Sequence, residues 1–281
     1  MPELPEVQTI VNDLQILTGD RFTGFWTNFE KAIKSKKLKK ELVGQKIKSI
    51  KRMGKNIVFE LDNEKFLILH LKMTGKLILS EKKSNTNTMS LVTGHLSLSK
   101  HLHHVFNLNK NGALEFHDIR KFATLEIVSK ERLSAMIKEK GVDPLSTSFT
   151  FKKFQKLLAS KENRNIKSFL MDQTAISGIG NIYASEIPFN AKLDPHRKMI
   201  SLSKSEALGL HRSILKILKK AILLRGTSFS DYRDAKNLRG SFQNHLKVYK
   251  KAGKKCVKCG TIIEKSVVEQ RSTFYCPTCQ K

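Results

Sequence analysis

The sequence predicts an α+β protein: an N-terminal β-sandwich with an N-terminal helix, then a helical domain, then a C-terminal hairpin that carries cysteines. Three observations support this fold class. Short apolar runs alternate with turn residues up to about residue 133, apolar residues recur at helical spacing after residue 150, and all four cysteines lie in the last 26 residues. We therefore expect domains at residues 1–133, 134–245 and 246–281, which a chain of 281 residues can accommodate.

The first domain begins with an amphipathic helix, because the apolar residues from Val7 to Leu17 recur on one helical face. β-branched or aromatic runs follow, separated by turn residues such as Gly54 and Gly75. The predicted strands are 46–50, 56–61, 66–71, 77–80, 104–107, 114–117 and 124–128. Many short strands with tight turns are typical of a sandwich or a barrel-like pair of sheets. The polar residues 84–100 predict a surface loop.

The helical domain follows a boundary at Asp143-Pro144-Leu145. Apolar residues at helical spacing predict short helices at 154–158 and 166–170 and a long amphipathic helix over 208–223. The mixed, polar residues 226–240 predict a mobile loop.

The chain is strongly basic, with 52 Lys and Arg against 25 Asp and Glu and a formal net charge of +27. Such an excess repels itself and is typical of proteins that bind a polyanion. The alternative is that the surface is generally rich in lysine and that the charge serves no specific partner. No apolar run is long enough to span a membrane. The chain start lacks the basic and apolar stretches of a signal peptide, so we expect a cytoplasmic protein.

The cysteines form two Cys-x2-Cys pairs, Cys256/Cys259 and Cys276/Cys279, separated by sixteen residues. Each pair can place two thiolates on one ion, and four thiolates complete a closed tetrahedral Zn²⁺ site. Such a site is structural, because no position is left for water; four unrelated free cysteines are the alternative. Residues 262–264 and 271–275 predict the two strands of a hairpin. On it, Arg271 either clamps a phosphate or is a solvated surface charge.

The N-terminus, Met1-Pro2-Glu3-Leu4-Pro5-Glu6-Val7, contains a candidate nucleophile. Removal of Met1 would expose the secondary amine of Pro2, which can attack a sugar carbon and form an iminium, as Schiff-base lysines do. The attacking amine must be unprotonated, so burial or neighbouring cations would have to lower its pKa. Glu3 is a candidate proton donor and acceptor, whereas Glu6 complements the dipole of the predicted helix. Prolines near N-termini are common, so Pro2 alone does not establish catalysis.

The chain start, the cysteine tail and several motifs between them resemble the Fpg/Nei family of helix–two-turn–helix DNA glycosylases over essentially the whole chain. The internal motifs are Met53-Gly54-Lys55, His70-Leu71-Lys72-Met73-Thr74-Gly75, Asp118-Ile119-Arg120-Lys121-Phe122, Gly178-Ile179-Gly180-Asn181 and Gln270-Arg271-Ser272-Thr273-Phe274. Leu4 favours the formamidopyrimidine-DNA glycosylase branch, because the endonuclease VIII branch has glycine there. The resemblance implies that the middle domain is a helix–two-turn–helix (H2TH) domain and that the cysteine hairpin is a zinc finger.

The resemblance also implies catalytic roles. Pro2 would attack C1′ of the damaged nucleoside, with Glu3 as the adjacent acid/base residue and Lys55 assisting at the lesion. Arg271 would belong to both the catalytic and the DNA-contact residues, because it grips the phosphates beside the lesion.

The remaining DNA-contact residues implied by the resemblance are His70, Met73, Arg120, Phe122 and Asn181. Met73, Arg120 and Phe122 would fill the space left by the extruded base. His70 and Asn181 would hold phosphates, together with backbone N–H groups of the GIGN turn. As bare residues, Met73 and Phe122 would instead be assigned to the core.

By the same resemblance, we expect a bifunctional DNA glycosylase and AP lyase of base excision repair. It would excise oxidised purines such as 8-oxoguanine and formamidopyrimidines by base flipping, a Pro2 Schiff base and β,δ-elimination. The alternatives are the same chemistry on oxidised pyrimidines and a non-catalytic zinc protein that binds damaged DNA. The expected cofactor is one structural Zn²⁺. The expected partner is damaged double-stranded DNA, bound by a cytoplasmic, nucleoid-associated monomer without membrane contact.

Overall fold

The computed structural model describes residues 1–80 and 100–281, so residues 84–99 of the predicted surface loop lie outside the described residues. The chain forms two compact units. The first unit comprises residues 1–2, 6–137 and 225–240, and the second unit comprises residues 3–5, 138–224 and 241–281. The chain therefore enters the second unit briefly at residues 3–5 and again after residue 137.

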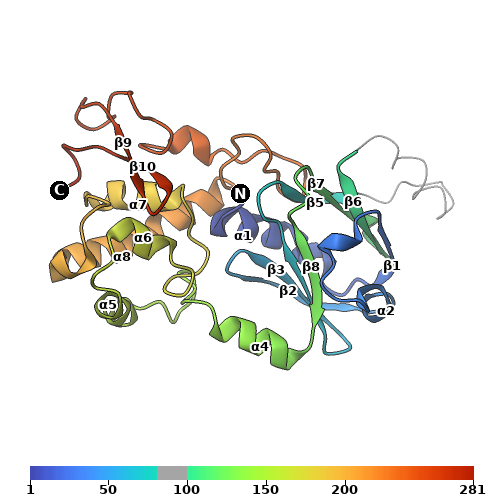
Figure 1. Ribbon diagram of the computed structural model, residues 1–281. Coiled ribbons are helices and arrows are strands. Elements are labelled where there is room, and N and C mark those ends of the chain that lie inside the picture. The colour runs from blue at the N-terminus through green and yellow to red at the C-terminus, as the bar shows by residue number, and fades with distance from the viewer. Residues whose placement is uncertain (81–99) are drawn as a thin grey trace. The chain divides into compact units, whose positions relative to one another are not determined.

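Two four-stranded antiparallel sheets build the first unit (Figure 1). One has the strand order β1-β6-β7-β5, with β1 Phe22–Thr27, β5 Gly75–Ser80, β6 Leu102–Leu108 and β7 Ala113–Asp118. The other has the order β2-β3-β4-β8, with β2 Ile47–Met53, β3 Asn56–Leu61, β4 Phe66–His70 and β8 Thr124–Val128. Both sheets contribute to one core, in which Phe22 of β1 meets Phe59 of β3 edge to face, 6.0 Å between ring centres. The predicted sandwich is confirmed.

Some elements of the first unit are not evident from the sequence. They are the strand β1, the helix α2 (Leu38–Leu42) and the helix α4 (Lys130–Lys138). Gly24 interrupts the pattern of β1, α2 has only five residues, and α4 has no buried residue to mark it. The predicted first helix, α1, runs over Leu4–Asp13, and Leu14–Leu17 form a 3-10 turn.

The helices of the second unit are α5 (Phe151–Ser160), α6 (Ile166–Met171), α7 (Tyr183–Ala191) and α8 (Lys204–Leu223). Thr150, Asn165 and Ser203 cap α5, α6 and α8, each accepting a hydrogen bond from a backbone N–H three residues later. The buried faces of the helices share one apolar core. The three predicted helices are confirmed, and α5 and α8 begin before their apolar pattern does because the capping residues set the first turn.

The C-terminal hairpin of the second unit pairs β9 (Glu264–Val268) with β10 (Arg271–Tyr275). The prediction for β10 is confirmed, but the first strand lies at 264–268 and not at 262–264. Glu269 and Gln270, with φ of +45° and +60°, form a two-residue turn that places Val268 opposite Arg271. Asn-Gly is the usual sequence signal for such a turn, and Glu-Gln does not predict one.

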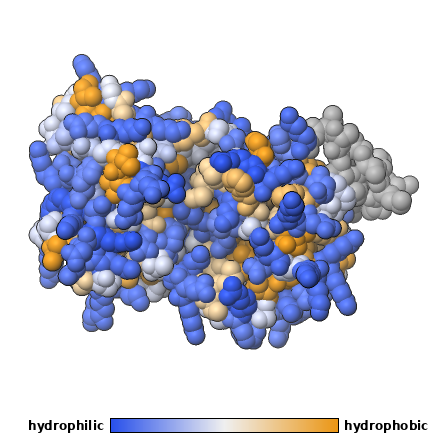
Figure 2. Space-filling model, in the orientation of Figure 1, coloured by the Kyte–Doolittle hydropathy of each residue, from blue (hydrophilic) through white to orange (hydrophobic). Residues whose placement is uncertain are grey.

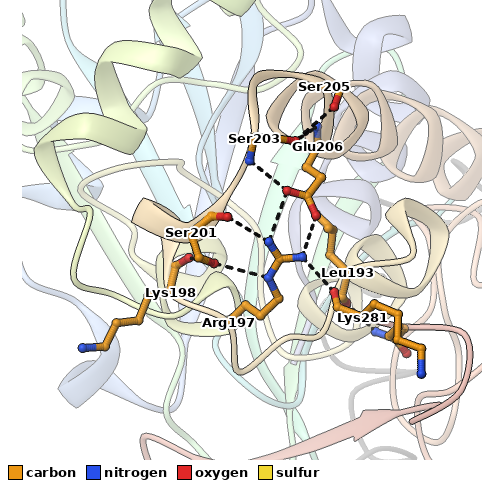
Figure 3. A network of polar contacts seen from close by, with 9 residues as sticks. Leu193, Arg197, Lys198, Ser201, Ser203, Ser205, Glu206 and Lys281 are labelled. Atoms are coloured by element: carbon orange, nitrogen blue, oxygen red, sulfur yellow. Dashed lines mark hydrogen bonds and ion pairs between the residues drawn. The ribbon is translucent and has the colours of Figure 1, made fainter.

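Arg197 ties the C-terminus to the helices of the second unit (Figure 3). Its guanidinium donates to Glu206 Oε1 at 2.6 Å and to the carbonyl oxygens of Ser201 and Lys281 at 2.9 and 3.0 Å. Glu206 also accepts from Ser203 N at the start of α8. The hydrogen bonds from Arg197 lower the pKa of Glu206 to about 2. The last residue of the chain is thus fixed to the first turn of α8.

Residues 226–240 have no helix or strand, but their anchoring does not fit the predicted mobile loop. Tyr232 and Asp234 are buried, and Asp234 accepts hydrogen bonds from Lys236 N and Leu238 N. Arg225, directly before the segment, forms an ion pair with Asp234. Polar residues that bond to their own backbone look like loop residues in a sequence, yet here they order the segment.

Hydrophilic residues cover most of the face shown in Figure 2, and apolar residues appear there as separate patches. No helix in the described part of the chain is long and apolar enough to cross a membrane.

Candidate active site

Pro2, the candidate nucleophile, is buried and lies shortly before α1. Met1 precedes it and is 53% exposed. The following residues are fixed in the second unit, where Leu4 is fully buried and its N donates to the Gly178 carbonyl at 2.9 Å. The start of the chain is therefore an ordered element and not a frayed terminus.

Glu3 is held by backbone N–H groups of the turn before α7. Its carboxylate accepts from Gly180 N at 2.8 Å and from Ile182 N at 3.0 Å, and the residue is 3% exposed. The N-terminal dipole of α7 also favours a carboxylate at this place. Glu3 therefore occupies the N–H groups of Gly180 and Ile182, which leaves the other N–H groups of the turn and the Asn181 side chain for the predicted phosphate contact. The sequence gives no sign of the contact, since Glu3 and Gly180 are 177 positions apart.

Lys167 is a fully buried residue of α6 that the sequence does not single out. Its Nζ donates to Ser185 Oγ at 2.8 Å and lies 3.3 Å from the Asn181 carbonyl oxygen. Burial lowers the pKa of Lys167 to about 7, while the negative charge of Glu3 acts in the opposite direction. The second unit therefore places a lysine that exchanges its proton near neutral pH within the electrostatic reach of Glu3. A lysine inside the apolar stretch of α6 is the one sequence signal for it.

In the first unit, Lys55 lies in the two-residue turn between β2 and β3. Gly54 precedes it with a φ of +60°, which glycine adopts without steric cost. His70 ends β4, and its Nδ1 accepts a hydrogen bond from Lys72 N at 2.9 Å. The ring proton of neutral His70 therefore lies on Nε2, which can donate to a phosphate oxygen.

The structure brings the three predicted void-filling residues together at two turns of the first unit. Arg120 Nη1 lies 3.0 Å from Met73 Sδ, and Arg120 Cζ lies 4.8 Å from the centre of the Phe122 ring. Met73 and Phe122 are 42% and 51% exposed, which excludes the core assignment for both. We call Met73, Arg120 and Phe122 the wedge.

Asp118 links the two turns that carry the wedge, a role that the sequence does not predict. One carboxylate oxygen accepts from Thr74 Oγ1 at 2.5 Å, and the other accepts from Ala123 N at 2.8 Å. Thr74 Oγ1 in turn accepts from Arg120 N at 3.0 Å. Both Asp118 and Thr74 are buried, so these bonds fix the backbone from which the wedge projects.

Arg271 begins β10 at the tip of the hairpin and lines a cavity of about 320 Å³ in the second unit. Arg164 and Lys167 lie on the same wall, and Asp172 there pairs with Arg164 at 2.8 Å. Glu269 lines the cavity as well, so three cations face two carboxylates there, and this small excess of positive charge suits an anion such as phosphate. Asn181 lies two residues before α7, and a hydrogen bond joins its side chain to that of Tyr249.

The four cysteine Sγ atoms lie within 4.8 Å of one another. The Sγ distances are 3.9 Å between Cys256 and Cys279 and 3.4 Å between Cys259 and Cys276. Four thiolates about 2.3 Å from a tetrahedral Zn²⁺ would be about 3.8 Å apart, so the cluster fits one structural zinc ion. It is the one group of potential metal ligands among the described residues.

Comparison with known proteins identifies the family. Family models match the formamidopyrimidine-DNA glycosylase N-terminal domain at residues 1–125, its H2TH domain at residues 140–233, and a zinc finger found in FPG and IleRS at residues 253–281. A formamidopyrimidine-DNA glycosylase of Carboxydothermus hydrogenoformans is 40% identical over 285 residues, covering 100% of both chains. The chain belongs to the formamidopyrimidine-DNA glycosylase family. A Mycoplasma genitalium member is 37% identical and covers 100% of this chain and 96% of its own.

Solved structures of formamidopyrimidine-DNA glycosylases share the fold. Lactococcus lactis Fpg in complex with DNA containing an abasic site has a TM-score of 0.86 at 34% identity over 99% of each chain. A mutant of the same enzyme in complex with Fapy-dG containing DNA has a TM-score of 0.86 at 35% identity over 100% of each chain. Family membership confirms the predicted H2TH domain and zinc finger, while the roles of the individual site residues stay predictions.

Proposed function

We propose that the protein is a bifunctional DNA glycosylase and AP lyase that removes oxidised purines from damaged double-stranded DNA in base excision repair. One observation carries the proposal: a buried Pro2 is followed by a Glu3 carboxylate that backbone donors hold in place. Membership of the formamidopyrimidine-DNA glycosylase family supports it. The protein works as a monomer at the nucleoid in the cytoplasm, with domains at residues 1–133, 134–245 and 246–281.

Pro2 is the proposed nucleophile after removal of Met1. Its nitrogen bonds to C1′ as the bond from C1′ to the base breaks, and the base leaves with that electron pair and takes up a proton. The nitrogen then gives up its proton, the C1′–O4′ bond breaks as O4′ takes up a proton, and the nitrogen lone pair forms an iminium with C1′. Loss of a C2′ proton then expels the 3′ phosphate, and a second elimination expels the 5′ phosphate. Attack requires the unprotonated amine, which a desolvated site would favour.

Glu3 is the proposed acid/base residue of these steps. Backbone N–H groups of Gly180 and Ile182 hold its carboxylate, which acts as an acceptor and as a negative charge that stabilises a cationic sugar. Lys55 assists at the lesion. Phosphate contacts are assigned to Lys55, His70, Asn181 and Arg271. The wedge fills the gap left by the flipped base, which offsets part of the few kcal/mol of stacking and pairing lost on flipping.

Borohydride trapping tests the proposal, because borohydride reduces the iminium to a stable bond between protein and DNA. The wild type should form this adduct with an oligonucleotide that contains one 8-oxoguanine. Pro2→Gly should bind the same oligonucleotide without forming the adduct, and so should a chain that retains Met1. Pro5→Gly is the matched control, since the same change at a position without a free amine should leave trapping intact. A wild type that binds but gives no adduct would instead indicate a non-catalytic protein that binds damaged DNA.

The second candidate function is the same chemistry on oxidised pyrimidines. One neighbour favours it: wild-type Lactococcus lactis Fpg (MutM) in complex with DNA containing an oxidized pyrimidine has a TM-score of 0.85 at 35% identity. Rates of trapping on purine and pyrimidine lesions in the same duplex would distinguish the two candidates. Faster trapping on the pyrimidine lesion would favour the second.

A further inference from the structure

Residues 31–40 of the first unit carry an unusual density of positive charge. The segment has six lysines and no acidic residue, hence a charge of +6, whereas +27 over 281 residues averages about +1 per ten. All six side chains are exposed, and none forms an ion pair with a described residue. We call these residues the lysine cluster: Lys31, Lys34, Lys36, Lys37, Lys39 and Lys40.

The backbone that carries the lysine cluster, residues 31–40, is ordered. Lys34 N donates to the Leu125 carbonyl at 2.8 Å, and Ser35 Oγ both donates to the Ile127 carbonyl and accepts from Ile127 N, each at 2.9 Å. Leu38 of α2 is buried in the core of the first unit. Six like charges repel one another, so fixing them together costs free energy that a freely solvated segment would avoid. A bound polyanion would remove this cost.

The segment that carries the lysine cluster begins close to the wedge. Lys121, next to Phe122, places its Nζ 5.3 Å from the ring centre of Phe29, two residues before the cluster. Leu125 and Ile127 bond to Lys34 and Ser35 of the lysine-cluster segment. They follow Phe122 by three and five positions, or about 10 and 17 Å at ~3.3 Å per strand residue. A duplex held at the wedge would cover that distance in about three to five base pairs at ~3.4 Å each.

We propose that the lysine cluster is a second contact for duplex DNA, which binds backbone phosphates several base pairs away from the lesion. The inference rests on the proposed function, because it takes the duplex to be held at the wedge. Lysine presents a point charge that reads no base, so this contact adds affinity without lesion selectivity. The cluster would keep the protein on flanking DNA whether or not a lesion is present.

The test compares two variants that lose the same charge. In the cluster variant, glutamine replaces Lys36, Lys37, Lys39 and Lys40. In the control variant, glutamine replaces four exposed lysines of α8, Lys204, Lys216, Lys219 and Lys220. Because all eight side chains are exposed, both variants should unfold at the temperature of the wild type. The double variant K39Q/K40Q provides a milder change of the cluster.

Binding is measured with duplexes that carry a stable abasic-site analogue, with one flank lengthened from about 2 to about 12 base pairs, one further helical turn. Wild type and control should gain affinity from the longer flank on one side of the lesion, and the cluster variant should not. On the long duplex, the slope of log affinity against log salt should fall by about 2–4 in the cluster variant, at ~0.9 per lost phosphate contact. The double variant should lose about half as much.

Equal losses in the cluster and control variants, or an unchanged salt slope in the cluster variant, would overturn the inference. Borohydride trapping on the short duplex separates this failure from a failure of the proposed function. The cluster variant should be trapped there as fast as the wild type. Absence of trapping in the wild type would refute the glycosylase and lyase activity itself.

Discussion

Replacing Gly180 with alanine should displace Glu3 without altering Glu3 or Pro2 themselves. A Cβ added at Gly180 would lie 2.4 Å from Glu3 Cδ and 2.5 Å from Oε1, far inside van der Waals contact. Glu3 is 3% exposed and bonded to the same turn, so it cannot give way without breaking its own hydrogen bonds. Gly180→Ala is therefore a probe of where the Glu3 carboxylate sits.

The size of the effect follows from the bonds at risk. Glu3 accepts hydrogen bonds from Gly180 N at 2.8 Å and Ile182 N at 3.0 Å and a longer one from Tyr183 N at 3.5 Å. A bond to a charged group contributes about 1.5–3 kcal/mol, so losing the two short ones would cost about 3–6 kcal/mol. Water can recover part of this loss, so Gly180→Ala should lower the free energy of unfolding by about 2–4 kcal/mol. Excision should slow by about 10²-fold or more, the usual effect of losing a positioned acid/base group.

Gly209 supplies the matched control. It lies within α8, where an added Cβ would meet nothing within 4 Å. Gly209→Ala should raise the free energy of unfolding by up to about 1 kcal/mol, because alanine is the better helix former, and should leave excision unchanged. Urea unfolding measures the stability, and single-turnover release of 8-oxoguanine measures the rate. If Gly180→Ala keeps the wild-type values of both, the Gly180 turn does not fix Glu3.

Zinc removal by a chelator, or Cys276→Ser, should weaken DNA affinity by loosening the hairpin that carries Arg271; unchanged affinity in a titration would show that the metal does not organise this contact. Burial lowers the pKa of His104 from 6.5 to about 4, so the fold favours the neutral ring. Its contribution to stability is complete above about pH 6.5 and is lost as the pH falls to about 4, by roughly 3 kcal/mol at ~1.36 kcal/mol per unit. Urea unfolding from pH 7 to 4 should show this slope and His104→Gln should flatten it; equal slopes would exclude His104 as the cause. A fluorescent reporter base beside the lesion should respond less to Phe122→Ala than to wild type, and an equal response would remove Phe122 from the wedge.

Local patterns in the sequence were sufficient for most of the fold. The strands of the sandwich other than β1, and α8, could be predicted because alternation and helical spacing of buried residues are local properties. β9 could not, because only Val268 of its five residues is buried. Its limits are set by pairing with β10 across the Glu269-Gln270 turn, a contact that no apolar pattern records.

Local motifs likewise predict some residues of the candidate site and miss others. The wedge could be predicted because Met73, Arg120 and Phe122 each stand in a short motif, although residue type alone assigns Met73 and Phe122 to the core. The environment of Glu3 could not be predicted, because its donors come from a turn far away along the chain. Lys167 was not predicted either, because its place in the apolar stretch of α6 is the one sequence signal that distinguishes it among 52 basic residues.

The glycines of the GIGN turn have a packing role that the sequence does not suggest. Gly178 has a φ of +95°, and a Cβ there would lie 2.8 Å from Leu4 Cβ, while a Cβ at Gly180 would collide with Glu3. Both glycines therefore make room for the first residues of the chain, and Gly178 also accepts the Leu4 N–H through its carbonyl. A terminal amine can act as a nucleophile only if the terminus is ordered. In this chain the order comes from a turn 177 positions away, so added volume in that turn should impair catalysis even where it touches no DNA.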